Sequence, residues 1–294
     1  MRTWNARGPS CVNIISAMKV LLCFLALSIG SPAAADESAP PNEAPTLTAE
    51  EIISHAIQHA DHLRQQKLEQ KFTFMELAVR EELTTDGGIK TRDVRRSKMY
   101  PVEGVLHGRV IERNGQPLSP EEREAENRRE EDLRRRIASG DQEQKDKNRV
   151  EFDRELIGRY RVSLAEKKIV DGRSTYVINF EPNSDRLPIR RRMDYALNKS
   201  RGKIFVDTET FEVARIEFRL IEPVGLWWGL LGKLRQVEGS VERRPSAEGY
   251  WAPTEFNIYM NMRVLFSNKH YRRQSQWSGH RLLSEPPEEA GASN

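Results

Sequence analysis

Three histidines with helical spacing are the first residues of this chain whose types could do chemistry. His55, His59 and His62 occur in "HAIQHADH" at positions i, i+4 and i+7, which places their imidazoles along one side of an α-helix. Imidazole nitrogens bind zinc, but a zinc site normally takes a further ligand from another element. No glutamate follows the first histidine, as it would in a metalloprotease motif. The three are weak metal candidates, and the polar shoulder of an amphipathic helix is the simpler interpretation.

The chain contains no recognised catalytic motif: no G-x-S-x-G, no phosphate loop and no dinucleotide fingerprint. Arginine runs recur instead, at Arg95-Arg96, Arg190-Arg191-Arg192, Arg243-Arg244 and Arg272-Arg273. Neighbours in a strand point to opposite faces, so each run puts at least one guanidinium in water. Such groups suit the phosphates of lipid head groups, although surface arginines balanced by glutamates are the commoner case. We predict a protein that is not an enzyme and needs no cofactor.

The first 35 residues have the organisation of a secretory signal peptide. Arg2, Arg7 and Lys19 precede the apolar run "VLLCFLALSIG", and "SPAAA" closes the segment. This pattern predicts cleavage after Ala35 and a periplasmic mature protein, since a membrane span needs about 20 apolar residues. An uncleaved N-terminal anchor is the alternative, and Met18 is an alternative translation start.

Removal of residues 1–35 changes what the composition allows. Three of the 47 basic residues lie there, which leaves 44 basic residues against 44 acidic ones. This balance removes the argument for a polyanionic partner, and we predict no nucleic-acid binding. Cys11 and Cys23 leave as well, so the mature chain has no cysteine for a disulfide, a thiol nucleophile or a metal site.

The mature chain begins with a linker and a helix. Residues 36–46 are polar and proline-rich, which predicts a disordered linker, and residues 285–294 predict a disordered tail. A helix should follow Thr48, which with Glu51 forms the sequence pattern of a capping box. Its apolar residues recur with the period of a helix up to about Leu68: Ile52, Ile53, Ala56, Ile57, Ala60 and Leu63.

Residues 119–149 predict a charged helical insertion within one domain of residues 47–284. Ser119 is a suitable N-cap and Pro120 suits the first helical position. Residues 119–148 hold ten acidic and eight basic side chains, and a helix this polar is solvated or loosely docked. An exposed insertion is the simpler interpretation; an arm that docks an envelope protein partner is the alternative.

The rest of the chain alternates like strands of an antiparallel sheet. Asp171-Gly172 and Asn114-Gly115 predict hairpin turns. Residues 254–266 alternate most clearly, with Phe256, Ile258, Met260, Met262, Val264 and Phe266 at every second position. We predict an α+β fold: a strongly curved antiparallel sheet, or half-open barrel, covered by the N-terminal amphipathic helix. Too few apolar helices exist to cover the sheet, so part of its apolar face should line a cavity.

These parts together resemble a known family. An exported chain, the helix "LTAEEIISHAIQHADHL" and the strand–turn–strand "GKIFVDTETFEVARIEFRL" are similar to outer-membrane lipoprotein-sorting (LolA-like) proteins. The resemblance covers residues 47–83 and 159–283, while the charged insertion departs from it. It implies a half-open barrel with a helical lid and an apolar cavity for lipoprotein acyl chains. No residue-level motif carries a functional residue across.

Within this frame "GLWWGLLGKL" predicts the edge of the cavity. An exposed apolar loop in a charged protein marks contact with lipid or a partner, although the two tryptophans could instead plug the open end of the sheet. The predicted lipid-binding residues are Leu226, Trp227, Trp228, Leu230, Leu231, Phe256, Ile258, Met260, Met262 and Phe266. The sequence thus favours a non-enzymatic carrier or sensor of a lipid or an acylated protein, with peripheral membrane contact. An envelope protein that acts through its charged arm is the alternative, and a metal-dependent enzyme is the third.

Overall fold

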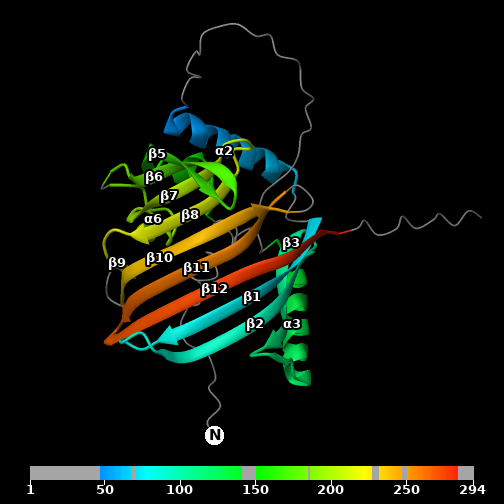
Figure 1. Ribbon diagram of the computed structural model, residues 1–294. Coiled ribbons are helices and arrows are strands. Elements are labelled where there is room, and N and C mark those ends of the chain that lie inside the picture. The colour runs from blue at the N-terminus through cyan, green and yellow to red at the C-terminus, as the bar shows by residue number, and fades with distance from the viewer. Residues whose placement is uncertain are drawn as a thin grey trace, which may run out of the picture.

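The computed structural model describes residues 47–67, 71–140, 150–184, 186–226, 232–246 and 250–283. The predicted signal peptide, linker and C-terminal tail lie outside these ranges. The described strands join in one antiparallel sheet, with a helix across one end and another beside the opposite end (Figure 1). Within these ranges no helix combines the length and apolar character needed to cross a membrane.

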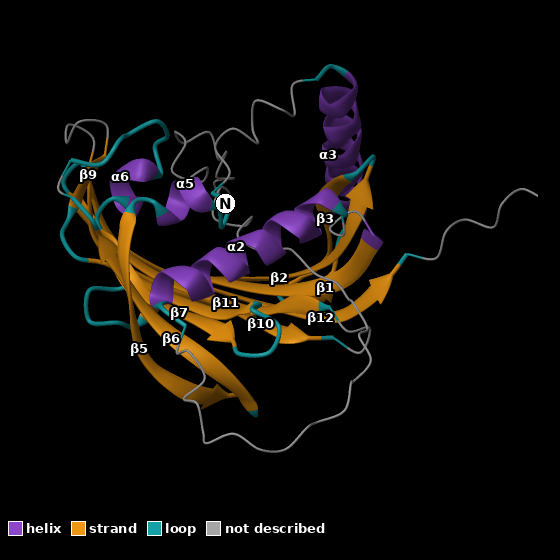
Figure 2. Ribbon diagram, turned by 90° about the horizontal axis from the view of Figure 1, so that it is seen from above, coloured by secondary structure: helices purple, strands orange, loops and turns teal. Residues whose placement is uncertain are grey.

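The sheet order is β4-β3-β2-β1-β12-β11-β10-β8-β7-β6-β5, and β9 pairs with β10. Since β4 and β5 stand at opposite ends of this order, the sheet is open, and the predicted α+β fold with a curved, unclosed sheet is confirmed (Figure 2). The strands are β1 (Phe72–Leu83), β2 (Ile89–Val102), β3 (Val105–Arg113), β4 (Gln116–Pro117), β5 (Tyr160–Val170), β6 (Arg173–Pro182), β7 (Ser200–Asp207), β8 (Val213–Leu220), β9 (Val224–Leu226), β10 (Gly232–Pro245), β11 (Trp251–Val264) and β12 (Ser267–Leu282).

Two of the hairpin turns form where the sequence predicts them. Asn114-Gly115 joins β3 to β4, and Asp171-Gly172 joins β5 to β6. All four residues have positive φ: 50° at Asn114 and 78° at Gly115, and 50° at Asp171 and 80° at Gly172. Two successive positive φ values give the turn a twist that matches the strands it joins, and glycine at the second position adopts one without strain.

The N-terminal helix α2 (Ala49–Gln65) is capped as predicted. The Thr48 hydroxyl accepts a hydrogen bond from the Glu51 N–H, and the Glu51 carboxylate accepts one from the Thr48 N–H. These bonds satisfy two backbone donors that would otherwise lack partners at the start of the helix. The helix ends at Gln65, three residues before the predicted end.

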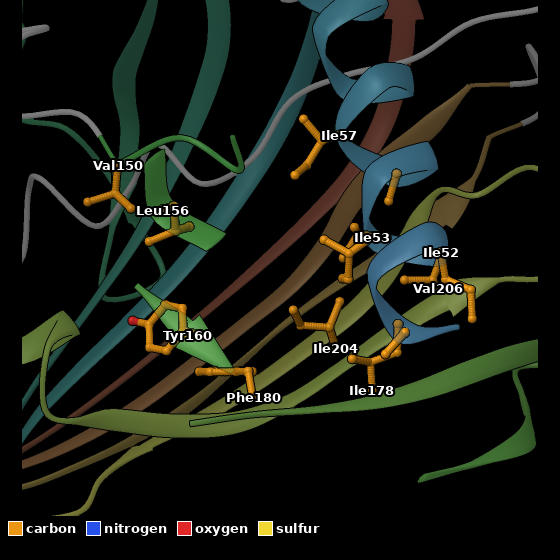
Figure 3. Packing of buried hydrophobic residues seen from close by; sticks show 13 residues of the cluster. Ile52, Ile53, Ile57, Val150, Leu156, Tyr160, Ile178, Phe180, Ile204 and Val206 are labelled. Atoms are coloured by element: carbon orange, nitrogen blue, oxygen red, sulfur yellow. The ribbon is translucent and has the colours of Figure 1, made fainter. Parts of the chain in front are cut away.

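One apolar side of α2 lies on the sheet. Figure 3 shows Ile52 and Ile53 facing Ile178, Ile204 and Val206 of β6 and β7. The short helix α5 (Arg154–Ile157) adds Leu156 to the same cluster. Leu63, near the other end of α2, packs with Trp251 and Phe72 at the starts of β11 and β1. The helix therefore covers β6–β8 and the beginning of β11.

Helix α3 (Pro120–Ala138) is the predicted charged helix, with Ser119 as its N-cap and Pro120 at its start. It is not simply exposed, because one side of it is docked on β2 and β3. Leu133 and Glu126 are buried. The Glu126 carboxylate accepts a hydrogen bond from the Val110 N–H at 3.0 Å, and the Tyr100 hydroxyl donates one to Glu130 at 2.5 Å. Hydrogen-bonded carboxylates, rather than an apolar stripe, hold this helix against β2 and β3.

Candidate functional site: an apolar sheet face bordered by arginines

The apolar face of the sheet has two parts, and α2 covers only one of them. The second part, which we call the strand wall, has eight buried members on β9, β10 and β11: Val224, Leu234, Val237, Val241, Phe256, Ile258, Met260 and Met262. The half-buried side chains packed against it also belong to strands: Phe218, Leu220, Val264, Tyr271 and Trp277. No described helix contributes to this cluster, so a single layer of sheet supplies the whole wall.

Cross-strand register holds the wall together. Phe256, Ile258 and Met260 of β11 pair with Val241, Gly239 and Val237 of β10. Directly paired residues project from the same face of a sheet. The four predicted wall residues of β11 therefore share one face, and each of them is only 4–6% exposed.

Phe266 does not belong to this wall, which corrects the sequence-based expectation. β11 ends at Val264, and Leu265 has a φ of +52° in the turn that leads to β12. The turn begins at Leu265 and ends the alternation, and the side chain of Phe266 in this turn is fully exposed. Apolar residues continue at every second position up to Phe266, but the backbone is no longer extended after Val264.

The predicted tryptophan loop joins the two strands at one border of the wall. Leu226 is the last residue of β9, and its backbone pairs with Gly232 at the start of β10. Trp227, Trp228, Leu230 and Leu231 lie outside the described residues. Two positions further along the same ladder, Val224 pairs with Leu234, and both belong to the wall. The loop therefore leaves and rejoins the sheet two residues from wall side chains.

Buried charges border the wall on the side of β12 and β1. Arg273 of β12 pairs in register with Ile258, and its guanidinium carbon lies 5.9 Å from the centre of the Phe256 ring. The Arg273 side chain is 3% exposed and donates hydrogen bonds to the Glu76 carboxylate at 3.2 Å and the Ser275 hydroxyl at 3.3 Å. Burial lowers the pKa of Arg273, against the opposing effect of Glu76.

Arg80 and Arg95 continue this border on the next two strands. Arg80 of β1 pairs in register with Arg273 on one side and with Asp93 of β2 on the other. Arg95 donates a hydrogen bond to Asp93 at 2.7 Å. Arg80 forms no hydrogen bond or ion pair within the described part of the chain. Burial and the nearby charges of Arg273 and Arg95 lower the pKa of Arg80 to about 10.

A hollow of about 900 Å³ is lined mainly by residues of the opposite, polar face, and Phe218, Ile258 and Arg273 also border it. Its side chains include Arg161, Arg201, Lys203, Arg215, Arg219, Arg272, Glu181, Glu217, Glu238, Asn257 and Tyr259. Several of the arginines are paired, as Arg272 is with Glu81 at 2.7 Å. This hollow is a charged surface, and it is not the apolar cavity that the sequence predicts.

The histidines of α2 do not converge. His55 lies 4.8 Å from the Phe211 ring, measured between ring centres, and His62 shares a hydrogen bond with Gln66. His59 lies 3.2 Å from Glu212, which pairs with Arg243 at 2.7 Å. Among the described residues no three His, Cys, Asp or Glu side chains are placed to hold a metal ion. His59 instead ties α2 to the sheet.

Glu76 and Arg80 belong to this site but were not predicted from the sequence. Both occur in β1, where Phe72, Phe74, Glu76, Ala78 and Arg80 occupy alternate positions. The signal was available, because two charges on the face of a strand that begins with two phenylalanines require partners. The ion-pair partner of Glu76 is Arg273, 197 residues away along the chain, and only the β1–β12 register brings Arg273 opposite Arg80.

Comparison with known proteins gives only distant similarities. No family model and no curated protein sequence matches the chain. Similar solved structures include a LolA superfamily protein from Nitrosomonas europaea (12% identity, 82% of this chain and 96% of that chain, TM-score 0.28). They also include a DUF1329 family protein from Desulfovibrio piger (12%, 83% and 95%, 0.31) and an outer membrane lipoprotein-sorting protein domain from Vibrio parahaemolyticus (10%, 82% and 95%, 0.28). The solved structures to which this chain is similar thus include the LolA superfamily that its sequence resembles, at identities that carry no functional residue across.

Proposed function

We propose that this protein is a periplasmic, non-enzymatic carrier or sensor that holds a lipid, or the acyl chain of a lipidated protein, against the strand wall. The observation that carries the proposal is that the wall is apolar, continuous over three strands and built from one layer only. No described helix packs on this wall, and apolar surface left open to water costs about 25 cal/mol per Å². An acyl chain is itself apolar, so it can pack on this wall and exclude water from it.

The composition of the wall fits a ligand of variable shape. Met260 and Met262 face the same side two residues apart. Methionine has three rotatable side-chain bonds and a polarisable sulfur, so it repacks around different partners. A core that needs only fixed packing could use branched residues, which have a higher β-propensity at these positions.

The location rests on the predicted signal peptide of residues 1–35, and the carrier role agrees with the lack of a recognised catalytic motif. The tryptophan loop at residues 227–231 would then lie beside the mouth of the site. Tryptophan suits such a position, because it is apolar with one polar N–H.

The direct test is to look for bound lipid. The mature chain, residues 36–294, is purified from the periplasm without detergent and analysed by native mass spectrometry and by lipid extraction. We expect a co-purified amphiphile that is lost in Met260→Asp and retained in Asn261→Asp, on the opposite face of β11. Ligand-free wild-type protein that also takes up no added lipid would contradict the proposal.

Docking through α3 is the second candidate, because its outward side stays charged and exposed. Arg128 and Arg135 are 60% and 76% exposed. Charge reversal there, as Arg128→Glu with Arg135→Glu, should leave the fold intact and abolish binding of an acidic protein partner. Deletion of residues 119–148 is a poor test, since it removes the buried Glu126 and Leu133 and should lower the melting temperature.

A further inference from the structure

Five charged residues form a compact group at the border of the strand wall. They are Glu76 and Arg80 on β1, Asp93 and Arg95 on β2, and Arg273 on β12. The register pairs Arg80 directly with Arg273 and with Asp93, so these three side chains leave the sheet on one face. The same row continues to Ile258 of the wall. The charged group and the apolar wall therefore form one surface.

The group holds more positive charge than negative. Three guanidinium groups face two carboxylates, and Arg80 stands directly opposite Arg273, a like-charge pair that destabilises a sheet. Arg273 pairs with Glu76, and Arg95 pairs with Asp93. Both carboxylates are thereby engaged by other arginines, and Arg80 is left as the excess charge.

Several donors of these arginines are buried without a partner. Nε and Nη1 of Arg273 and Nε of Arg80 are shielded from solvent and make no hydrogen bond among the described residues. A buried donor without an acceptor costs roughly 1–3 kcal/mol, and more when the group is charged. The Arg273 side chain is 97% buried beside Phe256. An acceptor that carried negative charge would correct both the missing hydrogen bonds and the excess charge.

We infer that Arg80 and Arg273 anchor the oxyanion head group, a phosphate or a carboxylate, of an amphiphile whose chain lies on the strand wall. The inference rests on the proposed function and adds the class of lipid. Guanidinium groups bind such oxyanions through two parallel N–H···O bonds. Arg80 stays charged at neutral pH, because burial and neighbouring arginines lower its pKa only to about 10.

The experiment compares two amphiphiles with the same chain. Dodecyl phosphate and the non-ionic octaethylene glycol dodecyl ether are titrated below their micelle concentrations into the delipidated mature chain, with calorimetry as the readout. We expect the phosphate to bind about 10- to 100-fold more tightly, as one or two charge-assisted hydrogen bonds provide. Arg80→Gln should remove this preference and leave binding of the non-ionic compound unchanged.

Arg219→Gln is the matched control. It removes the same charge from the opposite face, where Arg219 lines the polar hollow and makes no ion pair or hydrogen bond with described residues. The preference for dodecyl phosphate should survive in this variant. If Arg219→Gln loses the preference and Arg80→Gln keeps it, the head group binds in the hollow and the inference is wrong.

Thermal melts separate an anion site from a structural role. Arg80→Gln relieves repulsion from Arg273, so the ligand-free variant should melt no lower than the wild type; a lower melting temperature would assign Arg80 to the fold. If Arg80→Gln does not fold, Arg80→Met keeps the apolar stem and takes its place. If both amphiphiles bind equally well, the head-group site is wrong and the proposed carrier function stands. If neither binds, the carrier function itself is wrong. Inorganic phosphate that binds as tightly as dodecyl phosphate would show a free-phosphate site, against the lipid.

Discussion

Substitution of Met260 distinguishes a ligand-binding wall from an ordinary filled core. It is buried in a cluster made only of strands, whereas Ile178 is fully buried beneath α2. We expect Ile178→Ala to lower the free energy of unfolding by about 2–5 kcal/mol, the usual cost of a cavity in a filled core. Met260→Ala should cost less than about 2 kcal/mol, because no described helix packs on the wall. Urea denaturation measures both, and equal losses would make the wall ordinary core.

His280 should make the protein sensitive to acid. It lies 4.7 Å from the Phe74 ring, measured between ring centres, and burial lowers its pKa to about 4. The unfolded chain binds this proton near pH 6.5, so stability is present above that pH and is lost as pH falls toward 4. We expect His280→Phe to melt higher and to lose less stability between pH 6.5 and 4. An unchanged pH profile in the variant would assign the acid loss to other groups.

Single residues also show what sequence can and cannot determine. The alternation of strands requires that Arg272 and Arg273 face opposite ways, and they do: Arg272 meets Glu81 on the polar face, and Arg273 is buried with Glu76. Which of the two is buried depends on the register between β1 and β12, strands at opposite ends of the chain. No local pattern contains that information.

At the scale of elements, α3 shows how a helix docks without an apolar stripe. Glu126 is 7% exposed, bonds the Val110 N–H and pairs with Arg129. Because β3 lies next to the edge of the sheet, this carboxylate satisfies a backbone donor that would otherwise be unpaired. Ser119 and Pro120 indicate the helix and its N-cap in the sequence, but no pattern of residues indicates which side of it docks.

The docking can be tested with two glutamates of this helix. Glu126→Ala leaves the buried Val110 N–H without its acceptor and should cost about 1–3 kcal/mol of unfolding free energy. Glu124, whose side chain is 59% exposed, provides the control, and Glu124→Ala should stay within about 0.5 kcal/mol. Chemical denaturation compares them. If both variants lose similarly little unfolding free energy, α3 is an exposed insertion and is not docked through Glu126.

For the whole molecule, composition and periodicity were enough to predict an open, curved antiparallel sheet with one helix over part of its apolar face. They could not place the curvature. Two glycines stand on either side of β8, where Gly202 of β7 and Gly239 of β10 both pair in register with Phe218. A Cβ on Gly239 would lie 2.5 Å from the Asn257 carbonyl oxygen, and one on Gly202 would collide with the Glu217 carbonyl oxygen. Such close approach of backbones depends on the assembled sheet.

Gly202 should therefore be essential to the shape of the molecule. In an ordinary strand, replacement of glycine by alanine stabilises by about 0.5–1 kcal/mol, because the unfolded chain loses freedom. At Gly202 the added methyl meets the backbone of β8 and also lies 2.9 Å from the Phe180 ring. The backbone must move, so we expect Gly202→Ala to cost at least about 1–3 kcal/mol. The control is Gly108 of β3, where a Cβ would meet only the flexible Met99 side chain, 2.8 Å from its sulfur. Gly108→Ala should change the urea midpoint little, and if Gly202→Ala is equally mild, the curvature does not depend on this glycine.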